Sequence, residues 1–235
     1  MKICLLIIYS SSKEYFFMKC ILEKFYNTYI NDDFHFYFTQ FRESQIDDVE
    51  LEDRTIYIKG QETHLNILKK TVKSFELINK THDYDFCIRT NISTIVDINN
   101  LNKFLNSIPK TNIYCGGCVY LIDRLDIPFG VVDKSFFGKL FVQGTSIILS
   151  KDIVQSMCNK KDKINYNIID DVSIGLFIEE YHNNILADSK KNNAKFNFTG
   201  QYDLNAVFYR NKHNNRSSDI LFMEFIIKNI QKYNN

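Results

Sequence analysis

The sequence of 235 residues contains no tryptophan, two prolines and eight glycines, and no Gly-, Ser- or Pro-rich stretch interrupts it. Stretches of that composition link separately folded domains. Their absence favours a single domain over residues 1–235. Hydrophobic residues make up 45% of the chain and include 20 phenylalanines and 14 tyrosines, so the material for a large core is present.

An excess of charge is also missing, because 29 basic residues against 28 acidic ones leave a net charge of +1. A balanced chain has no global field that attracts nucleic acid or an anionic membrane surface. No segment approaches the roughly 20 apolar residues of a membrane span. The apolar run at residues 3–8 is too short for a signal peptide and favours a buried first strand. We therefore expect no nucleic-acid partner, no membrane span and a cytoplasmic location.

The six cysteines are scattered along the chain, a pattern typical of free, buried thiols in a reducing compartment. Cys115 and Cys118 have the spacing of a redox or zinc site, but no second pair and no nearby histidine accompany them. Structural thiols are the favoured interpretation, and a zinc or redox site is the alternative.

Strand-like segments alternate with helical patterns along the chain. The strand-like segments are residues 2–9, 34–40, 55–60, 84–89, 113–120, 141–150 and 205–210. The helical patterns cover residues 13–30, 61–79, 97–107, 151–158, 170–182 and 219–233. This alternation predicts an α/β fold with a mixed, mainly parallel central sheet flanked by helices. In the first helix, the apolar stripe Phe16, Phe17, Cys20, Ile21 and Phe25 is expected to face the core.

In sheets of this kind, ligands bind outside the carboxyl ends of the strands, near the point where strand order reverses. That rule places two polar segments in one cleft. Ser10 and Ser11 follow the first strand, and Thr90, Asn91 and Ser93 follow the strand at 84–89. The chain has no GxGxxG and no GxxxxGK[ST] motif, so a dinucleotide-binding or P-loop site would lack its phosphate cradle.

An acidic pair opens the apolar helix "NIIDDVSIGLFIEEY" at residues 167–181. One interpretation is structural, with Asp170 as the N-cap and Asp171 complementing the helix dipole, worth about 1 kcal/mol together. The other is catalytic, because a carboxylate aimed into a cleft can remove a proton from an acceptor hydroxyl. Gly175 lies where another element could approach this helix closely.

Four segments resemble, in order and spacing, blocks of the Fringe-like β1,3-glycosyltransferases. They are "GQETHLNILKKTVKSF" (60–75), "DYDFCIRTNISTIVDINNLNKFL" (83–105), "FVQGTSIILSKDIV" (141–154) and "IDDVSIG" (169–175). The resemblance implies a GT-A type, Rossmann-like fold and transfer of a hexose from a nucleotide-sugar, usually UDP-linked, to a carbohydrate or glycoconjugate acceptor with inversion. It also implies that Asp171 is the catalytic base and that Asp170 positions it or binds acceptor hydroxyls.

The family's metal-binding T-D-D-D run is replaced here by Thr90, Asn91, Ile92 and Ser93. Neutral oxygens bind Mn²⁺ or Mg²⁺ poorly compared with carboxylates, and the family's metal-ligating His corresponds to Phe208 or Tyr209. We therefore expect a site that requires no metal cofactor. Ser10, Ser11, Thr90, Asn91 and Ser93 would hold the nucleotide, and the basic run "FYRNKHNNRSSD" (208–219) would offset the charge of the diphosphate through Arg210, Lys212 and Arg216. The alternative for this run is a solvated loop.

Three further residues are candidate site residues, and two of them also have a structural interpretation. Arg89 is a candidate donor-binding residue or the partner of Asp85 or Asp97 in an ion pair. Gln143 and Gly144 are candidates for the acceptor-binding floor, whereas a bulge in the strand would also explain Gly144.

The favoured function is an inverting, metal-independent hexosyltransferase. One alternative is a catalytically inactive relative that binds a glycan or a partner protein. The other is a nucleotidyltransferase, for which "YSSSKEY" (9–15) supplies only Lys13 in place of a lysine- and glycine-rich loop.

Overall fold

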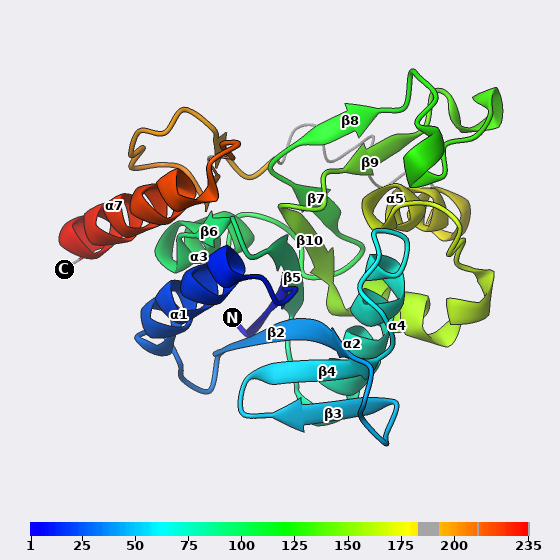
Figure 1. Cartoon of the computed structure of the whole chain (residues 1–235). Coiled ribbons are helices and arrows are strands. Elements are labelled where there is room, and N and C mark those ends of the chain that lie inside the picture. Colours follow the sequence, from blue (N-terminus) through cyan, green and yellow to red (C-terminus); the bar gives the residue numbers. More distant parts are fainter. Residues whose placement is uncertain (183–192, 211, 235) are drawn as a thin grey trace.

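The computed structural model describes residues 1–182, 193–210 and 212–234, and its centre is a seven-stranded sheet (Figure 1). The strand order is β3-β4-β2-β1-β5-β10-β7. In the parallel part, β1 (Ile3–Ile8) lies between β2 (Phe34–Arg42) and β5 (Phe86–Asn91), and β2 also pairs with β4 (Thr55–Lys59). Antiparallel pairing adds β3 (Val49–Glu52) at one edge, and β10 (Ile147–Ser150) followed by β7 (Tyr114–Gly116) at the other. The predicted mixed, mainly parallel sheet is confirmed.

Helices cover both faces of this sheet (Figure 1). One face carries α1 (Lys13–Asn27), α3 (Ile98–Leu105) and α7 (Arg216–Asn234). The other carries α2 (Ile67–Thr81), α4 (Lys151–Asn159) and α5 (Asp170–Tyr181). Because successive strand residues point to opposite faces, Leu5 of β1 joins the first core and Leu6 joins the second. The continuous apolar run of β1 is therefore the pattern of a strand that is covered twice.

Two smaller sheets lie beside the main one. The first contains β6 (Ile95–Val96), β11 (Phe196–Asn197) and β12 (Phe208–Tyr209), and the second pairs β8 (Val119–Leu121) with β9 (Leu140–Val142). Short 3₁₀ helices are η1 (Ile127–Phe129), η2 (Lys134–Phe136) and η3 (Lys161–Lys163). Two predicted strands are thus divided: residues 113–120 form β7 and β8, and residues 141–150 contribute to β9 and form β10.

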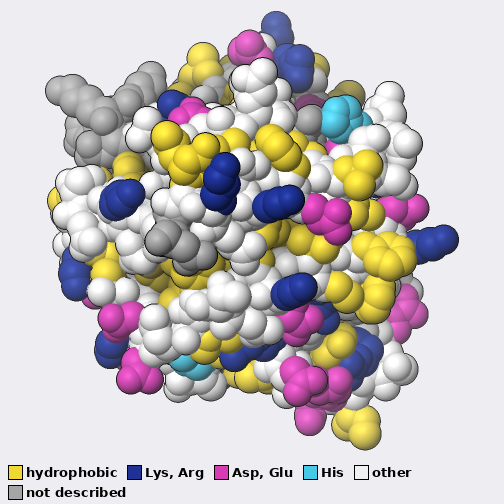
Figure 2. Space-filling model, turned by 90° about the vertical axis from the view of Figure 1, so that its left-hand side faces the viewer, with side chains coloured by type: hydrophobic (Ala, Val, Ile, Leu, Met, Phe, Trp, Pro, Cys, Tyr) yellow, Lys and Arg dark blue, Asp and Glu magenta, His cyan; other side chains and the backbone are white. Residues whose placement is uncertain are grey.

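The predicted core stripe of α1 is right for Phe25, which is buried, and wrong for Phe16 and Phe17, which are 55% and 47% exposed, and for the exposed Cys20. The buried residues are Met18, Leu22, Phe25 and Tyr26. A second apolar stripe with the same helical period exists on this helix, and packing against α7 selects it. On the side of the molecule where α1 and α7 lie, exposed hydrophobic side chains are interspersed with charged ones (Figure 2).

The two glycines between Cys115 and Cys118 have a packing role. A Cβ on Gly116 would lie 1.9 Å from the carbonyl oxygen of Ser146, and one on Gly117 would lie 2.4 Å from the ring of Phe196. Both cysteines are free thiols, and burial raises their pKa values, that of Cys115 to about 12. Within the described ranges, no three His, Cys, Asp or Glu side chains are grouped in a way that could hold a metal ion. None of the described helices is long and apolar enough to cross a membrane.

The order of the strands creates a crevice at the carboxyl ends of β1 and β5. After β1 the chain passes through α1 to β2 on one side, and it later returns through α2 to β5 on the other side of β1. The connections therefore diverge between β1 and β5, which is where ligands bind in open α/β sheets.

Candidate active site

A cavity of about 670 Å³ opens at the ends of β1 and β5. We call it the strand-end cavity. Most of the site residues predicted from the sequence line it: Ser10, Arg89, Asn91, Ser93, Gln143, Gly144, Asp170, Asp171, Arg210, Lys212 and Arg216. Two predicted residues are not in its wall. Ser11 is exposed beyond the end of β1, and Thr90 is fully buried, where its hydroxyl donates to the carbonyl oxygen of Thr145 at 2.7 Å.

A second cavity of about 590 Å³ adjoins the first, next to the β8–β9 hairpin. We call it the hairpin cavity. The two cavities share four wall residues, namely Phe129, Gln143, Ile169 and Asp171. Asp171 thus borders both cavities. The hairpin cavity was not predicted from the sequence.

Arg89 organises the wall between β5 and α5. Its guanidinium donates to the carbonyl oxygen of Gly144 and forms a buried ion pair with Asp170, whose side chain is 5% exposed. The predicted partners of Arg89 were wrong, because Asp85 bonds to Lys110 and Asp97 caps α3. Both terminal nitrogens of Arg89 are therefore occupied by the protein itself, whereas its buried Nε has no hydrogen-bond partner among the described residues.

The ion pair also explains why Asp170 is not the N-cap of α5. The N-cap is Ile169, and Asp170 is the first helical residue, turned toward Arg89. Gly144 lies in the turn between β9 and β10 rather than in a strand bulge, since the N–H of Ser146 bonds to the carbonyl oxygen of Gln143 at 3.1 Å. A Cβ on Gly144 would lie 2.4 Å from Nη1 of Arg89, so only glycine fits beneath this guanidinium.

Asp171, the second residue of α5, is held by two backbone N–H groups. Gly144 and Val172 each donate to its carboxylate at 2.9 Å. Burial, followed by the nearby charge of Asp170, raises the pKa of Asp171 to about 6, against the opposing effect of the Gly144 hydrogen bond. A carboxylate with a pKa near neutrality that faces a cavity is suited to accept a proton at physiological pH.

The polar residues after β5 bond to one another. The side-chain oxygen of Asn91 accepts hydrogen bonds from the N–H of Ser93 at 3.2 Å, the hydroxyl of Ser93 at 3.1 Å and the hydroxyl of Thr94 at 3.0 Å. Three donors around one amide oxygen are the opposite of a cation site, in which lone pairs converge on an ion. Phe208 and Tyr209 are buried. The residues at the end of β5 and in β12 therefore do not fit a divalent metal ion, although the Fringe-like enzymes that the sequence resembles bind one at the corresponding place.

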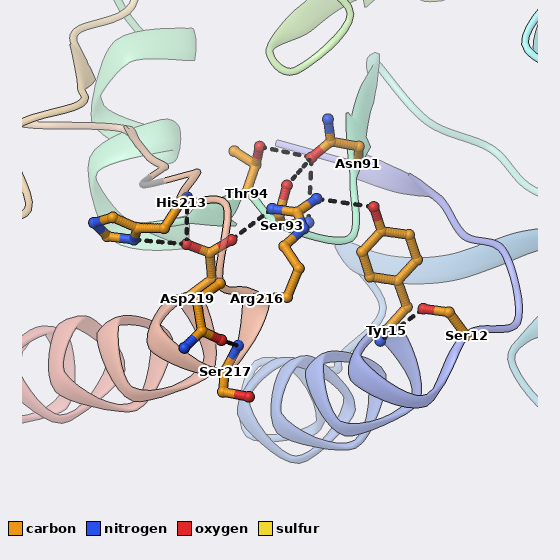
Figure 3. Close-up of polar contacts among 10 residues, drawn as sticks. Ser12, Tyr15, Asn91, Ser93, Thr94, His213, Arg216, Ser217 and Asp219 are labelled. Carbon is orange, nitrogen blue, oxygen red and sulfur yellow. Dashed lines mark hydrogen bonds and ion pairs between the residues drawn. The ribbon is translucent and has the colours of Figure 1, made fainter.

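The basic segment approaches the strand-end cavity from the other side. Arg216, the first residue of α7, forms an ion pair with Asp219 at 2.5 Å and donates to the hydroxyl of Tyr15 at 2.8 Å (Figure 3). The same Asp219 accepts from the ring and the N–H of His213, both at 2.9 Å (Figure 3). A solvated loop therefore does not describe Arg216, whose side chain is only 19% exposed.

Arg210 differs from Arg216 because its Nε is buried and has no hydrogen-bond partner among the described residues. Burial and the proximity of Arg216 lower the pKa of Arg210. A partly buried guanidinium that is repelled by a like charge provides a favourable place for an anion. Lys212, also in the cavity wall, is exposed.

Sequence reasoning missed the ion pair between Lys70, which is buried, and Glu62, whose side chain is 32% exposed, in the same cavity. Nζ of Lys70 donates to the carbonyl oxygen of Tyr9 at 2.7 Å and to both carboxylate oxygens of Glu62 at 2.7 and 2.8 Å. Burial lowers the pKa of Lys70. Lys70 is buried because α2 packs over a wide face, which also takes in Thr71 and Ser74.

No protein-family model matches the chain, and no curated protein matches it. Among solved structures, it is similar to a glycosyltransferase involved in the glycosylation of the major capsid of PBCV-1, at 15% identity and a TM-score of 0.49, over 96% of this chain and 100% of that one. It is also similar to galactosyltransferase LgtC in complex with donor and acceptor sugar analogs, at 11% identity and a TM-score of 0.42, over 96% of each chain. At these scores the likeness concerns the general course of the chain and does not identify an activity.

Proposed function

We propose that the chain is a glycosyltransferase that moves a hexose from a UDP-linked donor to an acceptor hydroxyl, with inversion and without a metal ion. The observation that carries the proposal is the position of Asp171. Its carboxylate, with a pKa of about 6, stands in the common wall of two adjoining cavities. A reaction that joins two substrates needs a base at the point where they meet.

In the proposed step, Asp171 accepts the proton of the acceptor hydroxyl while that oxygen forms a bond to the anomeric carbon. The bond between the anomeric carbon and the phosphate oxygen breaks, and the nucleoside diphosphate leaves with the electron pair. Attack from the face opposite the leaving group inverts the configuration. Asp170 and Arg89 are positioning residues. Arg89 pairs with Asp170 and donates to the carbonyl oxygen of Gly144, and this holds in place the Gly144 N–H that donates to Asp171.

Charge at the leaving diphosphate supports the assignment of the donor to the strand-end cavity. Two of its cations, Lys70 and Arg89, are already paired with acids inside the cavity wall. Arg210 and Lys212 have no such pairing in the described part of the chain, and Arg216 lines the same cavity while its acidic partner, Asp219, lies outside the cavity wall. We assign these three to the diphosphate, in the role that a metal ion has in related reactions. Ser10, Asn91 and Ser93 are assigned to the nucleoside side.

The proposal is tested by replacing Asp171 with Asn and measuring UDP release from a panel of UDP-hexoses in excess EDTA. We expect the wild-type chain to turn over under these conditions. Asp171→Asn should lower kcat by about 10²–10⁴-fold, the usual contribution of a general base, and UDP affinity should change only a few-fold.

Asp162→Asn, at an acid of η3 outside both cavities, is the matched control and should behave as wild type. Retained turnover in Asp171→Asn would contradict the assignment of the base. Loss of UDP binding in EDTA would contradict metal independence. Saturable glycan binding without any turnover would instead support an inactive relative.

A further inference from the structure

We infer that the hairpin cavity binds the acceptor, and that the group it receives is a neutral sugar ring. The inference rests on the proposed function for the direction of transfer. The cavity itself has the size of common ligand sites, which range over about 300–1,000 Å³. Since Asp171 and Gln143 belong to both cavities, a hydroxyl in the hairpin cavity can reach the proposed base while the donor occupies the strand-end cavity.

One wall of the hairpin cavity is aromatic and held in place by the fold. Tyr120 of β8 and Phe141 of β9 are direct partners in the antiparallel pair, with ring centroids 6.0 Å apart and planes inclined by 30°. Tyr120 is 46% exposed. Helix α5 approaches β9 so closely that a Cβ on Gly175 would lie 2.7 Å from Cβ of Phe141. The aromatic wall is therefore a fixed surface on which the apolar C–H face of a sugar ring can pack.

The acids of the hairpin cavity select against an anionic acceptor. Asp123, Asp126 and Asp171 line it together with one cation, Arg124, which gives a formal net charge of −2 when all are ionised. Carboxylates accept hydrogen bonds from sugar hydroxyls, and they repel carboxylates and phosphates of a ligand. This combination fits a neutral sugar and opposes a uronic acid, a sialic acid or a sugar phosphate.

Asp126 is fixed for such a role by its backbone. Its N–H and carbonyl oxygen both bond to Val131, at 3.0 and 3.1 Å, which closes the loop around η1. Although Asp126 is the N-cap of η1, its side chain makes no capping hydrogen bond. The loop is in turn attached to the start of α5, because the N–H of Ile169 donates to the carbonyl oxygen of Phe129 at 2.8 Å. The loop is thus attached to the end of α5 that carries the proposed base.

The test uses the full chain and two matched pairs of probes: methyl β-glucoside with methyl β-glucuronide, and methyl β-galactoside with methyl β-galacturonide. Each pair differs only in a neutral CH₂OH group against a carboxylate. Saturation-transfer NMR titrations are run with and without UDP. We expect saturable binding of at least one neutral glycoside and at least tenfold weaker binding of its charged counterpart. Tyr120→Ala should weaken binding of the neutral glycoside at least tenfold. Replacing Asp123 and Asp126 by Asn should reduce the difference in affinity between the neutral and the charged member of a pair.

Tyr166→Ala is the control for loss of an aromatic side chain, since Tyr166 is 36% exposed and lies outside both cavities. It should bind the glycoside as wild type does, and circular dichroism establishes that each variant is folded. The inference is overturned if no neutral glycoside binds, if binding survives Tyr120→Ala, or if the charged member of a pair binds equally well. Transfer to a hydroxyl-bearing peptide but to no glycoside would also overturn it. If the chain neither binds UDP nor releases it from UDP-hexoses, only the proposed function is contradicted. The glycoside titrations without UDP test the acceptor site independently.

Discussion

The strand-end cavity and the hairpin cavity share Asp171 but differ in charge and in origin. Five cationic and three acidic side chains line the first, whereas one cationic and three acidic side chains line the second. The first is built at the carboxyl ends of sheet strands, and the second is built on the β8–β9 hairpin and the loop between its strands. Asp171 thus stands between a cavity whose charge suits an anionic ligand and a cavity whose charge repels one. This arrangement fits the proposed transfer from an anionic nucleotide-sugar to a neutral acceptor.

The largest difference between the two cavities is expected in UDP affinity, when one cationic side chain of each cavity is neutralised. Arg210→Gln should weaken UDP binding about 10- to 100-fold, because it removes a partly buried guanidinium that faces the strand-end cavity. Arg124→Gln should leave UDP affinity unchanged, since Arg124 lines only the hairpin cavity. Isothermal titration with UDP in EDTA measures both. Equal losses in the two variants would show that the phosphates do not distinguish the cavities, and the assignment of the donor would fail.

The strand-end cavity could largely be predicted from the sequence because topology rules apply to it. Ser10 follows β1 and Asn91 is the last residue of β5, and these neighbouring parallel strands end at the same edge of the sheet. The acidic pair opens a strongly apolar helix, so its place at a helix start could also be predicted. What could not be foreseen is the pairing of Asp170 with Arg89, since the two are 81 residues apart and only the packing of α5 near β5 joins them.

The hairpin cavity could not be predicted, for a physical reason. Residues 122–139 have neither a strand period nor a helix period, and their shape is set by single contacts such as the bridge between Asp126 and Val131. Lys70 was missed because a lysine on a helix is normally solvated, and its burial depends on Glu62 in the preceding loop. The stripe of α1 failed because two apolar stripes compete on that helix and only the tertiary fold decides between them.

An intermediate effect is expected from pH. The pKa of Asp171 is about 6, and the proposed step needs the carboxylate form. With the donor and a neutral acceptor saturating, kcat should therefore be at a plateau above pH 7 and should fall about tenfold per pH unit below about 6. A UDP-linked donor and a neutral acceptor do not change their charge between pH 5 and 7. The fall in kcat would therefore report the protonation of the enzyme. A rate that is constant down to pH 5 would contradict the assignment of Asp171 as the base.

The smallest effect is expected in stability, and it compares Asp171 with the other acids. The pKa of Asp171 is raised from 3.8 to about 6 in the folded chain, so the folded state retains a proton that the unfolded state releases between these values. Ionisation of Asp171 therefore costs stability: the cost is absent below about pH 4, grows as pH rises and is complete above about 6. The shift corresponds to about 3 kcal/mol at most, and an Asn side chain keeps only part of the hydrogen bonding to Gly144 and Val172.

Asp171→Asn should consequently raise the free energy of unfolding by about 1–2 kcal/mol at pH 7.5 and by less at pH 4, while it lowers kcat. Urea titrations at the two pH values measure this difference. Asp170→Asn should have the opposite sign, because it leaves the buried guanidinium of Arg89 without its carboxylate partner. If Asp171→Asn destabilised the chain as Asp170→Asn does, Asp171 would be a structural residue like its neighbour, and the catalytic role of the shared wall would lose its physical basis.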